Sequence, residues 1–264
     1  MSEHQDANND STSARYPSLR DKCVLITGGA GGIAAAAAGR FAREGAHLAL
    51  VDLDRDGAQK VADRVGRAKV IAADVTQRGA VEAAVATARE EMGGVDILVT
   101  CAGGYTAYAN FESIEEQDWN RVIALNLHSV FLCCKAVIPL MKARGWGRII
   151  NLGSLAGRST SAGTSPAHYA AAKAAVAMLT QYIAKDVAPY GITANTIAPG
   201  TTVTDRVERL LTPEKRAAFI KATPVGALAE PEDIAGLIAF LASSESRHIT
   251  GATIDVNGGR LMLV

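Results

Sequence analysis

The sequence predicts a doubly wound α/β domain with a seven-stranded parallel sheet and helices on both faces. From Lys22 onward, short runs of β-branched and aliphatic residues alternate with longer alanine-rich stretches that have the period of a helix. The short runs are too apolar to leave one face in water, which is typical of parallel strands covered by helices on both sides. The expected strands are residues 22–27, 46–52, 68–73, 95–100, 147–152, 191–197 and 252–256.

Composition and charge narrow the class of protein. The chain has 264 residues, of which 48% are hydrophobic, and it carries 27 basic and 27 acidic side chains. The formal net charge of zero provides no basic surface for phosphates, so we expect no nucleic-acid partner. No run of about 18 or more apolar residues occurs, so we expect no membrane association. This profile is typical of a globular, enzyme-sized protein.

The first residues differ in composition from the rest of the chain. Residues 1–18 are rich in Ser, Asn, Asp and Gln, which predicts a disordered tail before a single domain over residues 19–264. The tail has neither the basic start nor the hydrophobic core of a signal peptide. The cysteines lie in apolar surroundings without metal-ligand spacing, which predicts buried free thiols and a cytoplasmic location. They are Cys23, Cys101, Cys133 and Cys134.

A glycine-rich loop follows the first expected strand. Residues 27–33 read TGGAGGI, and an alanine run over residues 34–38 then begins a helix. Glycines in this position allow the backbone to approach a pyrophosphate, which free N–H groups and the positive end of the helix dipole would bind. The arrangement predicts a Rossmann-type dinucleotide site, and an ordinary flexible loop is the alternative.

Two carboxylates follow the next strands. Asp52 closes the second expected strand, 20 residues after Gly32, where it can accept hydrogen bonds from the adenosine ribose hydroxyls of NAD. Asp74 ends the third strand and is a candidate acceptor for the adenine amino group. A turn or helix-capping role is the alternative for Asp74.

Tyr169 and Lys173 stand four residues apart on a predicted helix that Ser165 and Pro166 begin, so both side chains project from one face. Hydride transfer to a ketone needs an acid near its oxygen, and a phenol with a pKa of about 10 needs a neighbouring cation. One positive charge about 4 Å away supplies roughly 4 kcal/mol at an effective dielectric near 20, which is enough to lower the phenol pKa by about three. We therefore expect Lys173 to lower the pKa of Tyr169. A surface Tyr and Lys pair is the alternative.

Two further polar residues join this constellation. Ser154 follows the fifth strand, at the carboxyl edge where a doubly wound sheet binds ligands, and its hydroxyl could hold a substrate oxygen. Asn126 lies within an apolar helical segment and must find partners if it is buried. For Asn126, a backbone-bridging role and a proton-relay role are both open.

With these motifs the chain resembles the short-chain dehydrogenase/reductase family from about Leu19 to Val264. Within that family the sequence most resembles bacterial 3-oxoacyl-acyl-carrier-protein reductases and secondary-alcohol dehydrogenases. The resemblance implies that Tyr169 is the general acid/base, Ser154 positions the substrate oxygen, Lys173 lowers the tyrosine pKa and binds ribose, and Asn126 anchors a water relay. It also implies a homotetramer. The implied cofactor contacts are Thr27, Gly28, Gly32, Ile33, Asp52, Asp74, Val75, Ala102, Gly103, Tyr169, Lys173, Pro199, Gly200 and Thr204.

Two positions depart from the family pattern. The last loop glycine is Ala34 here, which adds a methyl group where helix and strand approach. The usual Asn-Ala-Gly after the fourth strand begins with Cys101, so the hydrogen bonds of that asparagine side chain are lost. Neither change touches the proton chemistry.

The sequence thus predicts an NAD(H)-dependent oxidoreductase that interconverts a secondary alcohol and a ketone. An NADPH-dependent 3-oxoacyl-thioester reductase is the alternative, against which Asp52 argues. A nucleotide-sensing protein without catalysis would be expected to lack part of the Ser, Tyr and Lys set. Residues 201–222 read as a short helical lid which, with residues 105–111, suggests a moderately hydrophobic small-molecule substrate. Arg206 and Arg209 could meet an acidic group or be solvated helix charges.

Overall fold

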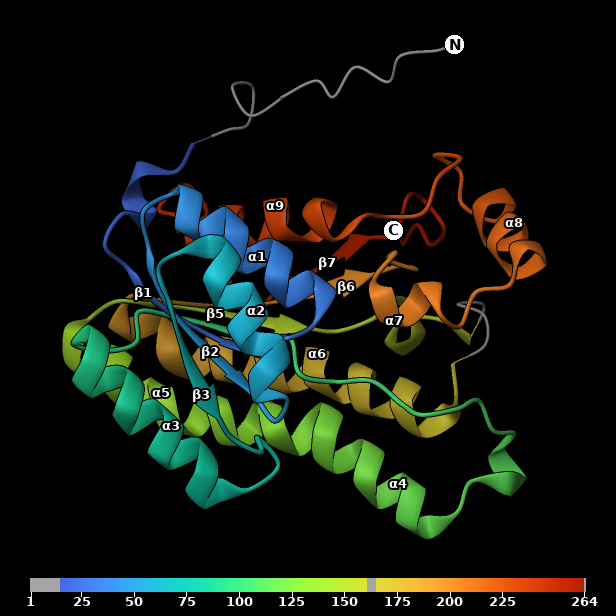
Figure 1. Cartoon of the computed structure of the whole chain (residues 1–264), viewed down its shortest axis with the longest axis horizontal. Coiled ribbons are helices and arrows are strands. Elements are labelled where there is room, and N and C mark those ends of the chain that lie inside the picture. Colours follow the sequence, from blue (N-terminus) through green and yellow to red (C-terminus); the bar gives the residue numbers. More distant parts are fainter. Residues whose placement is uncertain (1–14, 161–164, 264) are drawn as a thin grey trace.

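Seven parallel strands form one sheet in the order β3-β2-β1-β4-β5-β6-β7 (Figure 1). The computed structural model describes residues 15–160 and 165–263. The expected strands are confirmed, each within two residues of its predicted bounds. They are β1 (Cys23–Thr27), β2 (His47–Asp52), β3 (Ala68–Ala72), β4 (Ile97–Thr100), β5 (Gly147–Leu152), β6 (Ile192–Pro199) and β7 (Thr253–Val256).

Helices cover both faces of this sheet, as the apolar strands predict (Figure 1). Successive side chains of β1 enter opposite cores, because a strand alternates its side chains between faces: Val24 and Ile26 pack in one cluster and Leu25 in the other. One face carries α1 (Gly32–Arg43), α2 (Arg55–Val65) and α9 (Pro231–Ala242), and the other carries α3 (Arg78–Met92), α5 (Ser129–Arg144) and α6 (Ala167–Val187).

The strand order reverses direction between β1 and β4, which are hydrogen-bonded neighbours. In an open α/β sheet such a reversal leaves a crevice outside the carboxyl ends of the two strands. The loop after β1 and the loop after β4 therefore meet there. This edge is where the expected site residues gather.

A single long helical stretch runs from Glu116 to Arg144. It consists of α4 (Glu116–Ile123), a π-helical turn (Ala124–His128) and α5, and the N–H of Ser129 donates to the carbonyl of Ala124, five residues earlier. Its most apolar window has a mean hydropathy of 1.7, which by length and composition alone would allow a membrane span. Because the apolar side chains of α5 pack in the core on one sheet face, the fold accounts for that composition.

The N-terminal boundary of the domain lies earlier than the sequence predicts. The backbone N–H of Tyr16 donates to Glu44 Oε2 (2.9 Å), and the Tyr16 ring lies against Arg40 and packs in the core. Pro17–Leu19 then forms a 3-10 turn in which Leu19 is fully buried. The expected tail boundary at residue 18 is therefore too late, because one aromatic ring provides apolar surface to bury. The rest of the expected tail, residues 1–14, lies outside the described residues.

Candidate active site

The glycine loop after β1 has the geometry of a close-packed backbone cradle. Gly28 has φ +70°, and a Cβ there would lie 2.7 Å from the backbone nitrogen of Ala102 after β4. A Cβ on Gly32 would lie 2.8 Å from Cγ2 of Thr204, so the loop before α7 (Asp205–Glu208) covers the start of α1. Gly31 caps α1 without a side-chain hydrogen bond, which leaves the first-turn N–H groups to an anion. These residues fit a dinucleotide pyrophosphate.

Asp52 lies directly against this loop. Its Oδ2 accepts from the backbone N–H of Ala30 (2.9 Å), and its Oδ1 accepts from the N–H of Asp54 (2.9 Å). The carboxylate is thereby fixed at the carboxyl end of β2, beside the segment that would hold the pyrophosphate. Its place fits the ribose contact that the sequence predicts.

Asp74 forms a local turn. Its Oδ1 accepts from both the backbone N–H (2.9 Å) and the hydroxyl (2.7 Å) of Thr76. The turn role is thus present, and an adenine contact stays a prediction. The neighbouring Val75 side chain is buried in the core, so a cofactor contact there would have to use its backbone.

Ser154 and Tyr169 meet at the carboxyl edge of the sheet. Ser154 follows β5, Tyr169 lies in the first turn of α6, and the Ser154 hydroxyl is near enough to lower the pKa of Tyr169. Lys173 is buried one turn further along α6, where its Nζ donates to the carbonyl of Leu152 (2.7 Å) and lies 5.8 Å from the centroid of the Tyr169 ring. A Cβ on Gly157 would lie 2.6 Å from the backbone of Lys173, so a glycine there allows the loop after β5 to touch the helix.

The electrostatics of this pair differ from the expectation. Burial raises the pKa of Tyr169, while the hydrogen bond from Ser154 and the charge of Arg206 lower it by less. Burial also lowers the pKa of Lys173 to about 8. The net shift of the tyrosine pKa in the chain alone is therefore upward, and the lowering of that pKa by Lys173 stays a prediction. The buried ammonium of Lys173 donates to the Leu152 carbonyl and is itself costly to charge.

Asn126 is fully buried in the π-helical turn and holds the loop after β4. Its Oδ1 accepts from the N–H of Gly104 (2.7 Å), and its Nδ2 donates to the carbonyls of Gly104 and Val122 (both 2.8 Å). A Cβ on Gly103 would lie 2.8 Å from Asn126 Oδ1 and 3.1 Å from Lys173 Nζ. The backbone-bridging role is present, and the side chains of Asn126 and Lys173 both lie close to Gly103.

The structure brings some predicted residues together and leaves others apart. The Thr27 hydroxyl accepts from the Ala102 N–H (3.3 Å). Ile33 instead packs against the core. Pro199 ends β6 opposite Val256, and Gly200 lines a separate pocket of about 310 Å³ with residues from the C-terminal segment.

Among the four cysteines, Cys101 is the one at this site. Burial raises the pKa of its thiol to about 12, and Lys173 opposes that shift. Cys23, Cys133 and Cys134 are buried free thiols, as expected, whereas Cys101 is partly exposed.

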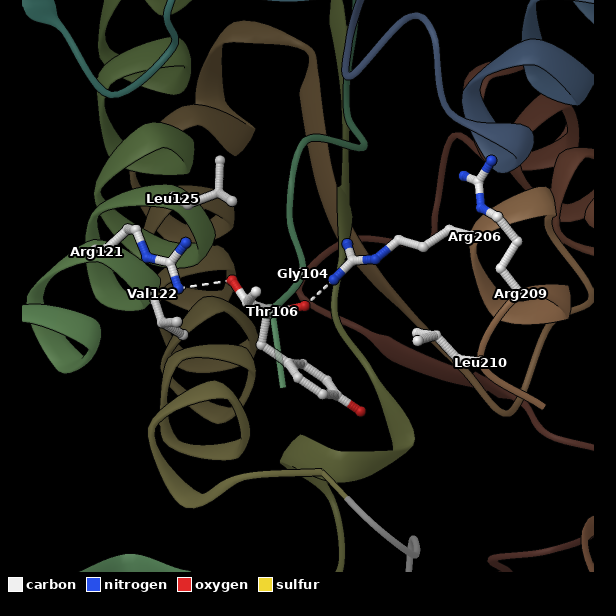
Figure 2. Close-up of a pocket in the computed structure, with 9 residues that line it drawn as sticks. Gly104, Thr106, Arg121, Val122, Leu125, Arg206, Arg209 and Leu210 are labelled. Carbon is white, nitrogen blue, oxygen red and sulfur yellow. Dashed lines mark hydrogen bonds between the residues drawn. The ribbon is translucent and has the colours of Figure 1, made fainter. Parts of the chain in front are cut away.

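The sequence predicts that residues 105–111 lie near the substrate, but it does not predict their contact with Tyr169. The Tyr105 ring lies 4.9 Å from that of Tyr169, and the Tyr105 carbonyl accepts from the guanidinium of Arg206. A pocket of about 400 Å³ opens beside this contact (Figure 2). Two aromatic residues 64 positions apart carry no spacing signal, so only the fold reveals the pair.

The chain is similar to known reductases over nearly its whole length. Residues 28–260 match a family model described as enoyl-(acyl carrier protein) reductase. The chain is 41% identical to the 3-oxoacyl-acyl-carrier-protein reductase FabG of Vibrio cholerae over 93% of its length and 99% of that protein. It is 39% identical to the FabG of Escherichia coli K12, over 92% of this chain and 98% of that one. A 3-oxoacyl-acyl-carrier-protein reductase of Brucella melitensis, solved with bound NAD, superimposes with a TM-score of 0.86 at 32% identity over 94% of both chains.

Proposed function

This chain belongs to the short-chain dehydrogenase/reductase family, and we propose that it interconverts a 3-oxoacyl compound and its 3-hydroxyacyl counterpart. The observation that carries the proposal is the approach of the Ser154 hydroxyl to Tyr169 at the carboxyl edge of the sheet, with Lys173 buried one helical turn further along α6. The named relatives support the 3-oxoacyl substrate, which is the alternative in the sequence analysis, over a general secondary alcohol.

The residues of the site divide the reaction between them. A bound nicotinamide supplies the hydride when the ketone is reduced. The Ser154 hydroxyl orients the carbonyl oxygen, and Tyr169 Oη donates its proton to that oxygen as the C=O π bond breaks. Lys173, with a pKa of about 8, carries a proton at neutral pH and stabilises the resulting phenolate. Alcohol oxidation runs the same transfers in reverse.

We further propose NAD(H) as the cofactor. The Asp52 carboxylate is fixed against the glycine loop by the Ala30 and Asp54 N–H groups, so it cannot easily turn away from a ribose phosphate. A like charge at about 4 Å costs roughly 4 kcal/mol at an effective dielectric near 20, before screening. The bound NAD in the Brucella protein supports the choice, because that relative is also named a 3-oxoacyl reductase.

A cytoplasmic homotetramer completes the proposal. Large hydrophobic side chains on α5 and α6 are exposed on the single chain, which supports a further subunit over them. They are Phe131, Met178 and Tyr182.

The free cysteines support the proposed cytoplasmic location, because the cytoplasm keeps thiols reduced.

The test is a substrate panel followed at 340 nm with NADH and with NADPH. It contains a 3-oxoacyl pantetheine thioester, short 3-oxo esters and simple ketones without an acyl group. We expect turnover of the 3-oxoacyl compounds with NADH at least tenfold above that of the simple ketones. Equal efficiency across the panel would support a general alcohol dehydrogenase, and no turnover of any ketone with either cofactor would contradict the proposed activity.

A further inference from the structure

The pocket beside Tyr105 is basic as well as apolar. Figure 2 shows Arg121 and Leu125 on one side of the loop after β4, and Arg206, Arg209 and Leu210 on the other. The described residues that line the pocket include these three arginines and no aspartate or glutamate. A cavity near 400 Å³ is at the lower end of the range for small-molecule sites. Its dimensions suit a compact ligand with one apolar and one anionic part.

Arg206 forms no ion pair with any residue that the structure describes. Its guanidinium lies against Gly104, where an added Cβ would come within 2.8 Å of its Cζ, and it donates to the carbonyls of Gly103 and Tyr105. These acceptors are neutral, so the positive charge persists in the pocket. It also acts on the site, because it lowers the pKa of Tyr169.

Arg209 is the second available cation. Its guanidinium has no ion pair within residues 15–160 and 165–263. Of the two acids on α7, Glu208 is paired with Arg216 of α8 (Pro213–Lys221), and Asp205 forms no ion pair with Arg206 or Arg209 within the described residues. Arg121, by contrast, is engaged by Asp118 and Thr106. Two of the three arginines thus line the pocket without an ion pair inside the described part of the chain.

We propose that Arg206 and Arg209 bind an anionic group on the substrate, a carboxylate or a phosphate, while its carbonyl lies at Ser154 and Tyr169. This inference rests on the proposed function. Guanidinium groups bind such oxyanions through paired, charge-assisted hydrogen bonds. Arg206 lies in α7, and Arg209 is the residue that caps the C-terminal end of this helix. Binding of the anion would thereby draw α7 toward the loop after β4.

The test compares each ketone with a matched partner that lacks the charge. The probes are acetoacetate against methyl acetoacetate, and 4-oxopentanoate against its methyl ester. We expect wild-type kcat/KM to favour at least one acid over its ester about tenfold, and Arg209→Gln to reduce that ratio about tenfold. Arg209→Lys should keep most of the preference because it keeps the charge. Arg89→Gln, which removes an exposed charge on α3, is the matched control and should leave the ratio unchanged.

A second pair of probes distinguishes the source of the anion. These are 3-oxobutyryl-pantetheine with and without its 4′-phosphate. A preference for the phosphorylated form that Arg209→Gln removes, with no preference among the acids, would assign the anion to a carrier arm. If every neutral probe is turned over as well as its charged partner, the anion subsite is wrong and the proposed function stands. If no probe is turned over with either cofactor, both proposals are wrong.

Discussion

The ring of Tyr105 lies 4.9 Å from the ring of Tyr169, between centroids, and is tilted by 59°. Such an edge-inclined aromatic contact shields one side of the phenol from water. Because the same Tyr105 accepts from Arg206 through its carbonyl, the loop after β4 and helix α7 meet over the proton donor. The proposed substrate pocket and the proposed proton donor therefore share one aromatic contact.

Replacing Tyr169 with Phe tests the proton donor. The change removes only the hydroxyl, so we expect turnover to fall by several orders of magnitude, in line with the ~10²–10⁴-fold of general acid–base catalysis, and NADH affinity to stay within a few-fold. Single-turnover kinetics and fluorescence titration of NADH measure the two effects. Substantial residual turnover would exclude Tyr169 from this role.

Arg206→Gln tests the electrostatics of the same hydroxyl. In alcohol oxidation the phenolate is the base, so the rate rises with pH through the apparent pKa of the Tyr169 and Lys173 pair. The charge of Arg206 lowers the pKa of Tyr169, so its removal should shift the kcat/KM profile to higher pH. Arg89→Gln should leave the profile in place. An unshifted pH profile of kcat/KM in Arg206→Gln would show that the charge of Arg206 does not affect the pKa of Tyr169.

Lys173→Met should change how stability depends on pH. The folded pKa of Lys173 is about 8, below its ordinary 10.5, so the unfolded chain binds more protons between these values. The cost of the buried charge is present in full below pH 8 and is relieved as pH rises. Wild type should therefore gain roughly 3 kcal/mol over the variant between pH 8 and 10.5.

Urea denaturation at intervals of one pH unit measures this difference, with Lys60→Met on the exposed side of α2 as the control. Above pH 10 the raised pKa of Tyr169 acts in the opposite direction, because the folded state then binds more protons. Parallel curves for wild type and Lys173→Met would contradict the depressed lysine pKa. Lys173→Met should also weaken cofactor binding, since the expected ribose contact is lost.

Asp52→Ser tests cofactor choice. We expect kcat/KM with NAD to exceed that with NADP by about 10² in the wild type, since half of one unit of like-charge repulsion already exceeds tenfold. The variant should narrow the gap mainly by improving NADP. Initial rates with both cofactors at one ionic strength measure the ratio of kcat/KM with NAD to that with NADP, in the wild type and in the variant. A preference that does not move would show that Asp52 is not the discriminating contact.

The N-terminal boundary yields a prediction about stability. A chain that begins at Leu19 should melt several degrees lower than one that begins at Arg15, because it loses the Tyr16 ring from the core and the bond from the Ser244 N–H to Ser18 (3.1 Å). Differential scanning calorimetry of the two chains makes the comparison. Tyr16→Ala in the longer chain should reproduce most of the loss, and equal melting temperatures would show that the ring contributes little.

The sheet was predictable from sequence because parallel strands buried on both faces must be short and apolar throughout. β5 has the bounds that its sequence run predicts, and β6 extends two residues further, to Pro199, through pairing with β7. Pairing across the sheet is a tertiary effect and leaves no mark on local composition. The tail boundary was misplaced for a similar reason, since one Tyr in a polar segment gives no periodic signal.

The site was predictable in its residues and not in its energetics. Ser154, Tyr169 and Lys173 meet as the motif spacing predicts, whereas the sign of the tyrosine pKa shift depends on burial and on where the lysine ammonium points. Neither the burial of Tyr169 nor the direction of the lysine ammonium can be predicted from a spacing of four residues. The contribution of Arg206 was not predictable from local sequence either, because the fold brings this residue of α7 near Tyr169 from 37 positions away.

The π-helical turn at Ala124–His128 amounts to one residue more than an α-helix would use over the same rise. Deleting one residue there would restore the regular spiral, but each helical residue turns about 100°, so α4 and α5 would rotate by that angle relative to each other. Asn126 could then no longer face Gly104 while α5 keeps its apolar side chains in the core. The fold therefore restricts the length of this segment more strictly than its composition. We expect insertions and deletions among relatives to fall outside it.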